Sequence, residues 1–249
     1  MTTRPRILRL LGGIALASAV ALAGVAPVTA ADRYRQDVAR TADFVAQTNF
    51  VQCVGASLQM MINMIEPGRD RSAREQLRLQ KLARKFSPAR TDGRIRQGAS
   101  VRGWVKVLHR EVDQPYRLVG ADTLKQAVRM AARAIERTGA PVGLLVWRGR
   151  HAWVMSGFES TKPLDQGGKV TSVTIYDPLY PHGDDFWGPS PRPGVPISVK
   201  ALGRQFVPRR TNNNSNRFTT TLRQAYPTLS GKYVLVLPYI PYAPARRPG

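Results

Sequence analysis

The chain is poor in three kinds of residue: cysteines, histidines and acids. Its 249 residues include one cysteine, three histidines and 16 acidic residues, against 38 lysines and arginines. A single cysteine excludes an internal disulfide, and with three separated histidines it excludes a zinc site of the usual ligand spacing. We therefore expect neither a metal nor an organic cofactor.

Long apolar runs are also missing from most of the chain. No segment after residue 30 approaches the roughly 18 apolar residues that a membrane-spanning helix requires. Residues 1–30 have a basic start, an apolar run from Leu10 to Val25 and a small-residue end at Ala30, which predicts a secretory signal peptide cleaved after Ala30. A retained membrane anchor is the alternative, but glycines and Pro27 interrupt the apolar run. We expect a secreted protein with no stable membrane span after cleavage.

The shortage of acids leaves a net charge of +22. Such a charge attracts anionic polymers of the cell envelope, nucleic acids or acidic surfaces. The arginines are scattered along the chain, as solubilising charge would be, and no nucleic-acid-binding motif accompanies them. Anionic envelope polymers are therefore candidate partners, whereas specific nucleic-acid binding is not expected.

The order of local signals predicts an α+β fold. Apolar residues at helical spacing occupy the first half, whereas short apolar or alternating runs occupy the second. We expect one domain, 31–249, with a helical lobe at about 53–138 and an antiparallel sheet lobe at about 141–240. The expected helices are 53–65, 72–86, 100–112 and 121–138, the last capped by Asp122, and the expected strands are 142–147, 151–158, 170–176 and 232–237. Segments 32–48, 89–97, 161–169, 182–196 and 211–216 are expected to be polar or surface loops.

The lone cysteine, Cys53, stands at the start of the first expected helix. A thiol attacks a carbonyl carbon only as its thiolate, and the unpaired amides and dipole of a helix N-terminus favour an anion there. An unpaired thiol outside the cell is also exposed to oxidation, so its presence requires a reason. Cys53 is a candidate nucleophile; the alternative is a small buried apolar residue.

A nucleophilic thiol needs a base, and histidine is the residue to look for. His151 opens an expected strand directly after the turn at 148–150, where a rigid element can aim the ring. His109 lies inside an expected helix, which favours a packing or solvated role. His182 lies in a glycine-rich loop, which favours a surface role with substrate contact as an alternative. We therefore predict that His151 is the general base.

Two more residues complete the expected site. Asp177 stands at the end of the next expected strand, and neighbouring strands bring such residues to one edge, where a carboxylate fixes the imidazole tautomer. The alternative is that Asp177 and Pro178 only begin a turn. For the oxyanion we predict the backbone amide of Cys53 and the side-chain amide of Gln47, six residues upstream. The adjacent Gln52 would point away from the nucleophile.

These motifs occur in an order that resembles a known family. Residues 47–53 (QTNFVQC), followed by small residues at 55–57, resemble the oxyanion glutamine and nucleophile segment of papain-like cysteine peptidases. Residues 151–158 (HAWVMSGF) are similar to the histidine strand of that family, and the aspartate at 177 is similar to its bacterial, bacteriocin-processing branch, which acts on double-glycine leaders. The resemblance covers roughly residues 44–180. It implies a papain-like fold, in which an N-terminal helical lobe with the nucleophile helix packs on a C-terminal antiparallel sheet, and the same four site residues.

We therefore hypothesise a secreted cysteine peptidase that cleaves peptide or isopeptide bonds of a peptide or protein substrate through a thioester. Cys53 attacks, His151 transfers the proton, Asp177 orients His151 and Gln47 helps to bind the oxyanion. An acyltransferase on the same fold would use the same groups. A non-catalytic, basic envelope-binding protein with a remnant site is the alternative from a different class.

Overall fold

The computed structural model describes residues 33–88, 97–210 and 229–240, which belong to one compact unit, 32–249. In chain order its elements are β1 (Tyr34–Asp37), η1 (Thr41–Asp43), α1 (Cys53–Ile65), α2 (Ala73–Lys85), α3 (Val101–Glu111), β2 (Tyr116–Ala121), α4 (Leu124–Thr138), β3 (Val142–Val146), η2 (Trp147–Gly149), β4 (His151–Ser160), β5 (Val170–Tyr176), β6 (Gly183–Asp184), β7 (Gly188–Pro189), β8 (Pro196–Ser198), α5 (Val199–Gln205) and β9 (Tyr233–Pro238). The signal peptide expected at 1–30 and the polar tract at 211–216 lie outside the described residues. No helix within the described ranges is long and apolar enough to cross a membrane.

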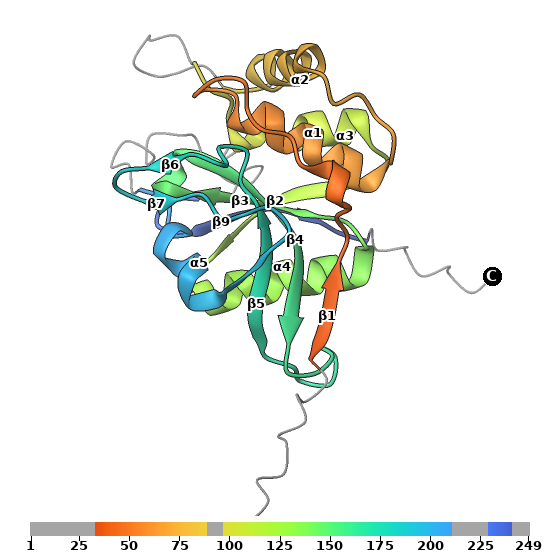
Figure 1. Cartoon of the computed structure of the whole chain (residues 1–249), viewed down its shortest axis with the longest axis vertical. Helices are drawn as coiled ribbons and strands as arrows, with labels where there is room; N and C mark the ends of the chain where they lie inside the picture. The colour runs from red at the N-terminus through yellow and green to blue at the C-terminus, as the bar shows by residue number, and fades with distance from the viewer. Residues whose placement is uncertain (1–32, 89–96, 211–228, 241–249) are drawn as a thin grey trace, which may run out of the picture. The chain divides into compact units, whose positions relative to one another are not determined.

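A seven-stranded antiparallel sheet forms the centre of the fold (Figure 1). Its strand order is β2-β9-β3-β4-β5-β8, and β1 also pairs with β4. β3 pairs with residues 151–155 of β4, and β1 pairs with residues 157–160, so these two strands share one edge of β4. β4 is therefore enclosed along its length, which fits its almost fully buried residues.

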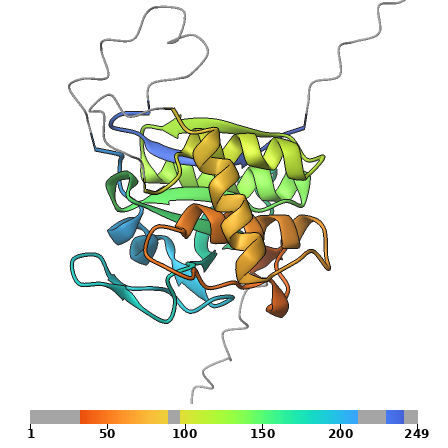
Figure 2. The same ribbon diagram turned by 90° about the horizontal axis from the view of Figure 1, so that it is seen from above.

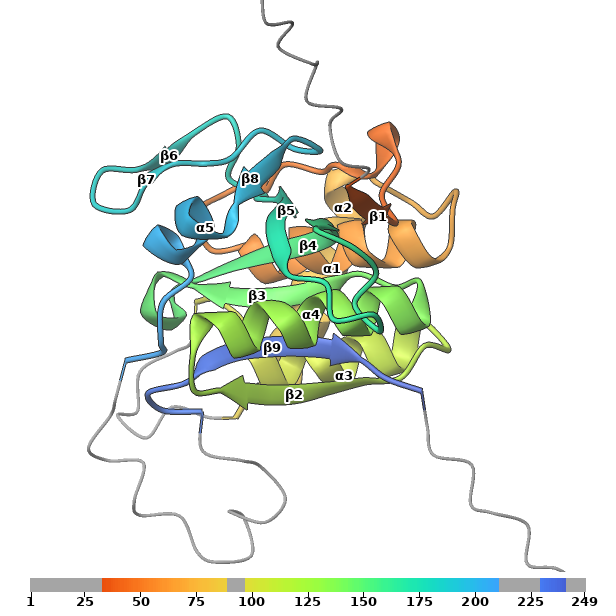
Figure 3. The same ribbon diagram turned by 90° about the horizontal axis from the view of Figure 1, so that it is seen from below.

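Side chains of the sheet alternate between two apolar cores, as the two-residue period of a strand requires. α1, α2 and α3 cover one face, and α4 and α5 cover the other (Figures 1 and 3). Ala152, Val154, Tyr176, Val234 and Val236 belong to the core with α1–α3, whereas Trp153, Met155, Ile175, Leu235 and Leu237 belong to the core with α4. The α+β fold class is confirmed.

The three helices α1–α3 pack closely, with α2 lying over α1 and α3 (Figure 2). A Cβ on Gly103 of α3 would lie 2.0 Å from the carbonyl oxygen of Ala83 in α2. A Cβ on Gly55 of α1 would lie 2.9 Å from the carbonyl oxygen of Gln76. Only glycine therefore permits these two close approaches of α2.

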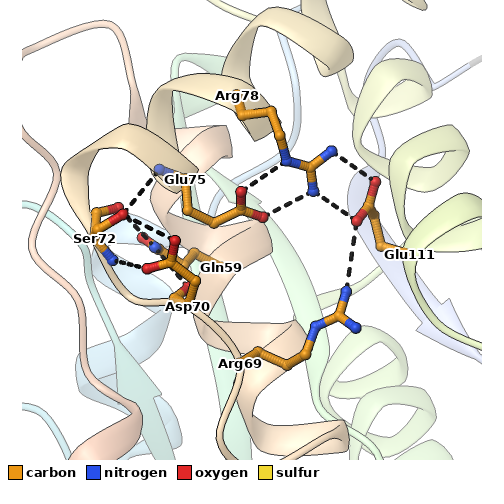
Figure 4. Close-up of polar contacts among 7 residues, drawn as sticks. All are labelled: Gln59, Arg69, Asp70, Ser72, Glu75, Arg78 and Glu111. Atoms are coloured by element: carbon orange, nitrogen blue, oxygen red, sulfur yellow. Dashed lines mark hydrogen bonds and ion pairs between the residues drawn. The ribbon is translucent and has the colours of Figure 1, made fainter.

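Ion pairs join α2 and α3 on their solvent side (Figure 4). Arg78 of α2 contacts Glu75 at 2.7 Å and Glu111 of α3 at 2.6 Å. Arg69, in the connection between α1 and α2, contacts Glu111 at 3.6 Å. The Arg78 side chain is 47% exposed, and pairs of this kind contribute roughly 0–1 kcal/mol each.

Several predicted elements differ from the structure. The prediction that Asp122 caps the helix at 121–138 is wrong: the Thr123 hydroxyl accepts a hydrogen bond from Gln126 N, and the helix begins at Leu124. Asp122 pairs instead with Lys232 of the neighbouring strand connection. The sequence also did not predict the short elements β1, β2, β8 and α5. α4, which was included in the expected helical lobe, packs on the opposite face of the sheet from α1–α3.

Candidate active site

Cys53 is the first residue of α1 and is partly exposed. No acceptor for its backbone N–H lies among the described residues, whereas the Gly55 N–H donates to Oε1 of Gln80 at 2.9 Å. Free amides at a helix start favour negative charge. The sulfur and an unoccupied N–H donor thus occupy the same end of α1.

Two buried glutamines of α2 hold the loop that leads to Cys53. Gln80 donates to Val51 O at 2.7 Å as well as accepting from Gly55 N. Gln76 donates to Ala46 O and accepts from Thr48 N, both at 2.9 Å. Because both amides are almost completely buried, losing one would leave backbone groups without partners. α2 therefore fixes the backbone on both sides of the nucleophile.

His151 and Asp177 form a buried hydrogen bond at the edge of the sheet. His151 is the first residue of β4, and Asp177 follows β5, its antiparallel neighbour. Nε2 of His151 lies 2.6 Å from Oδ1 of Asp177, and this oxygen also accepts from Leu179 N at 2.8 Å. The carboxylate is fully buried and His151 is 4% exposed. Asp177 therefore fixes the ring orientation and leaves Nδ1 for another partner.

The Cys53 thiol is close enough to His151 to interact with its imidazole. Burial by itself lowers the pKa of His151, because it disfavours the charged ring. The hydrogen bond with Asp177, the interaction with Cys53 and the Coulombic attraction of both groups outweigh burial and raise the pKa of His151 from 6.5 to about 9. The imidazole is therefore positively charged at neutral pH, and a charged imidazole beside sulfur favours a thiolate.

A buried serine joins the two elements that carry these groups. The Ser57 hydroxyl of α1 donates to the Ala152 carbonyl of β4 at 3.2 Å. Ser57 lies one helical turn after Cys53, and Ala152 follows His151 directly. The bond thus fixes α1 against β4 next to the reactive pair.

An indole covers one face of the imidazole. The ring centroids of Trp147 and His151 are 4.2 Å apart, with 23° between their planes. Trp147 is buried, and its Nε1 donates to Oε1 of Gln205 at 2.9 Å. Trp147 and Arg148 have φ angles of 56° and 55°, a left-handed conformation that costs non-glycine residues about 1–3 kcal/mol each. The stacking and hydrogen bond hold the turn in this form and restrict rotation of His151.

Gln47 lies at the same site through its backbone. Its N–H donates to Pro178 O at 2.7 Å, directly after Asp177. Its side-chain Nε2 donates to Asn49 O at 2.9 Å and has a second hydrogen with no acceptor among the described residues. Gln52, which was expected to point away from the nucleophile, is the N-cap of α1, and its side-chain oxygen accepts a hydrogen bond from the Thr48 hydroxyl.

The other two histidines lie outside this hydrogen-bonded group. The ring of His109, near the end of α3, contacts the backbone of Tyr116. His182 is exposed, and its backbone bonds to Leu179 and Ser190. The structure thus brings Cys53, His151 and Asp177 together.

Sequence reasoning missed the residues that support this group: Ser57, Gln76, Gln80 and Trp147. One signal was present, since Gln76 and Gln80 occupy the positions of α2 that face the core with Leu79 and Ala83. Polar residues at core positions require buried partners. Nothing local to the sequence could have paired Trp147 with His151, because that contact depends on a turn of unusual backbone conformation.

Eight chains of solved structures match this chain. No family model and no curated protein matches the chain. Among solved structures, it is similar to a crystal structure from Bacillus anthracis that is provisionally described as a C39-like peptidase. The match covers 79% of this chain and 94% of that one, with 13% sequence identity and a TM-score of 0.39. Similarity at this level transfers no function to this chain.

Proposed function

We propose that this chain is a cysteine hydrolase that cleaves peptide or isopeptide bonds through a thioester intermediate. The observation that carries the proposal is the chain of contacts in which Asp177 forms a hydrogen bond with the buried His151, and His151 interacts with Cys53 at the start of a helix. Such a chain combines a nucleophile, a base and an orienting carboxylate, which is the minimum for nucleophilic acyl transfer. The order of these groups along the chain agrees with the papain-like motifs of the sequence.

Each step of the reaction has a residue to perform it. The Cys53 sulfur attacks the carbonyl carbon, and the oxyanion accepts hydrogen bonds from the backbone N–H of Cys53 and from the Gln47 amide. His151 gives its proton to the leaving amine as the C–N bond breaks, which leaves a thioester on Cys53. His151 then takes a proton from water, whose oxygen attacks the thioester and releases the acid. Asp177 holds the imidazole throughout.

The setting of the reaction follows from the N-terminal sequence. The basic start, apolar run and small-residue end of residues 1–30 support export through a cleaved signal peptide. The positive net charge supports contact with anionic polymers of the cell envelope.

Alkylation by iodoacetamide tests the site directly. Cys53 is the only cysteine, so the gain of a single adduct in the intact mass reports on this sulfur alone. We expect fast alkylation that stays fast below pH 7, because the charged His151 stabilises the thiolate. A rate that rises only around pH 8.5, as for an ordinary thiol, would contradict the ion pair.

Product analysis then tests the reaction. We expect hydrolysis of quenched fluorescent peptides by the wild-type chain and none by Cys53→Ala. A product joined to an added amine would instead identify an acyltransferase. If Cys53→Ala retained the full biological activity and ligand binding, the chain would be a binding protein.

A further inference from the structure

Large apolar side chains are exposed mainly on two loops beside the candidate site. Among the described residues, six are exposed: Phe50 (87%), Val51 (37%), Leu77 (40%), Phe186 (78%), Val195 (43%) and Ile240 (66%). Phe50 and Val51 lie in the loop that ends at Cys53, and Phe186 and Val195 lie in the segment that follows Asp177. The two most exposed residues, Phe50 and Phe186, are therefore close in the chain to the nucleophile and the carboxylate.

The loop before α1 and the segment after β5 contact each other near their starting points. Gln47 N donates to Pro178 O at 2.7 Å, which joins the loop before α1 to the segment after β5. The rings of Phe44 and Tyr180 also meet edge to face, with centroids 6.0 Å apart. Figures 1, 2 and 3 show the β6–β7 hairpin on the same side of the molecule as the N-terminal end of α1. The loops thus leave this junction beside the reactive groups.

Phe186 is held at the tip of the β6–β7 hairpin by local bonds. Oδ1 of Asp184 accepts from Phe186 N at 3.0 Å and from Trp187 N at 2.9 Å. The rings of Phe186 and Trp187 pack edge to face, with centroids 4.9 Å apart. Nε2 of Gln205 donates to Pro189 O at 3.1 Å and fixes the base of the hairpin to α5. The hairpin therefore presents an ordered aromatic surface.

The turn that contains Phe50 is also held by local hydrogen bonds. Asn49 O accepts from Gln52 N at 3.2 Å, and Asn49 Oδ1 accepts from Val51 N at 3.1 Å. Gln80 binds the Val51 carbonyl from α2. The backbone around Phe50 is therefore fixed while its ring is left in water.

We propose that Phe50 and Phe186 form a docking surface for the substrate, which is a polypeptide segment with bulky apolar side chains next to the bond that is cleaved. This inference rests on the proposed function of Cys53. Ordered apolar groups in water mark interaction sites, and a partner that covers Phe50 lies within three residues of the nucleophile. The short stretch of chain between Phe50 and Cys53 favours a substrate as this partner over a second copy of the chain or a membrane surface.

Peptide binding to the full chain carrying Cys53→Ala tests the inference without any cleavage. The probes are two fluorescent peptide pools with a fixed central glycine, one randomised over Phe, Leu, Ile and Val at the flanking positions and the other over Ser, Thr, Asn and Gln. We expect the apolar pool to bind at least about tenfold more tightly, since each lost apolar contact costs 10-fold or more. Adding Phe50→Ser and Phe186→Ser should remove this preference.

The matched control is Leu77→Ser with Ile240→Ser, which removes two exposed apolar side chains from α2 and from the segment after β9. We expect this control to leave the preference unchanged. Equal binding of both pools, or equal loss in the control, would overturn the docking surface. A concentration-dependent dimer in sedimentation that disappears with Phe50→Ser and Phe186→Ser would also overturn it in favour of a second copy.

Failure of the hydrolase proposal and failure of the docking surface give different experimental results. If the apolar pool binds as expected but the chain with Cys53 intact does not cleave it, the docking surface stands and the hydrolase proposal fails. If the intact chain cleaves both pools with equal kcat/KM and KM, the hydrolase stands and the docking surface fails.

Discussion

Two ion pairs of this molecule have the same length and opposite surroundings. Arg78 and Glu111 meet at 2.6 Å on the solvent side of α2 and α3, where the arginine side chain is 47% exposed. His151 and Asp177 also meet at 2.6 Å, where the side chains are 5% and 0% exposed. Water and salt weaken the first pair, whereas the second pair keeps most of its Coulombic attraction and loses its hydration. Because the two distances are equal, burial decides which pair has the stronger electrostatic effect.

Removing the buried imidazole should have the largest effect. We expect His151→Gln to slow peptide hydrolysis by at least about 10³-fold, because the thiol loses both its base and the charge that favours its thiolate. The rate of alkylation at pH 6.5 should fall as well. His109→Gln is the matched control and should change neither rate. Wild-type rates in the His151→Gln chain would contradict the site.

Removing only the charge of the orienting group should have the next largest effect. We expect Asp177→Asn to lower kcat/KM by roughly 10²-fold or more and to move the alkaline limb of the pH–rate profile to lower pH. The sign follows from the cause: Asp177 raises the pKa of His151 towards about 9, so loss of the carboxylate lets the imidazolium lose its proton at lower pH. Asp122→Asn, in the surface pair with Lys232, should leave the profile unchanged. A limb that stays in place would show that Asp177 does not act on His151.

Gln80 is buried but uncharged, so its replacement tests whether a buried hydrogen-bonding side chain affects stability without an ion pair. We expect Gln80→Ala to reduce the free energy of unfolding by about 1–3 kcal/mol, because the Gly55 N–H and the Val51 carbonyl lose their buried partner. Activity should fall with it, since the loop before Cys53 is released. Urea unfolding measures the first effect. The control, Gln126→Ala, removes an exposed glutamine and should change the free energy of unfolding by less than about 0.5 kcal/mol. An equal loss in both variants would show that burial does not decide the size of the effect.

The exposed pair should give the smallest effect. We expect Arg78→Ala to reduce the free energy of unfolding by less than about 1 kcal/mol and to leave hydrolysis unchanged. The loss should shrink further in 1 M salt, because exposed charges are screened. Lys81→Ala, on the same helix, is the control for loss of one cation. A loss of several kcal/mol in Arg78→Ala would mean that the network of Figure 4 stabilises the helices far more than its exposure allows.

The sequence predicted those parts of the fold that have local signals. The starts of α1 and β4 were predicted because an apolar helical period begins at Cys53 and a turn precedes His151. The closeness of His151 to Asp177 followed from the pairing of adjacent strands, and the structure brings them into contact. Their catalytic roles stay predictions until they are tested.

The parts that escaped prediction depend on distant partners. β1 (Tyr34–Asp37) is short and polar, and only pairing with residues 157–160 of β4 makes it a strand. β2 contains Arg117 and Gly120 and pairs with β9, more than 100 residues later. Aspartate is a residue type that often caps helices, but Ala121, directly before Asp122, is held in the sheet opposite Tyr233. The helix therefore begins later, and Thr123 is its N-cap. In each case a long-range contact overrides the local preference.

The stacked rings of Trp147 and His151 also give the protein a built-in optical reporter. An excited indole passes an electron to a neighbouring imidazolium more readily than to a neutral imidazole, so Trp147 emits less light while His151 carries its proton. The emission of this tryptophan should brighten as alkali removes that proton, near pH 9. Proton movements at the reactive pair can therefore be followed in the unlabelled chain.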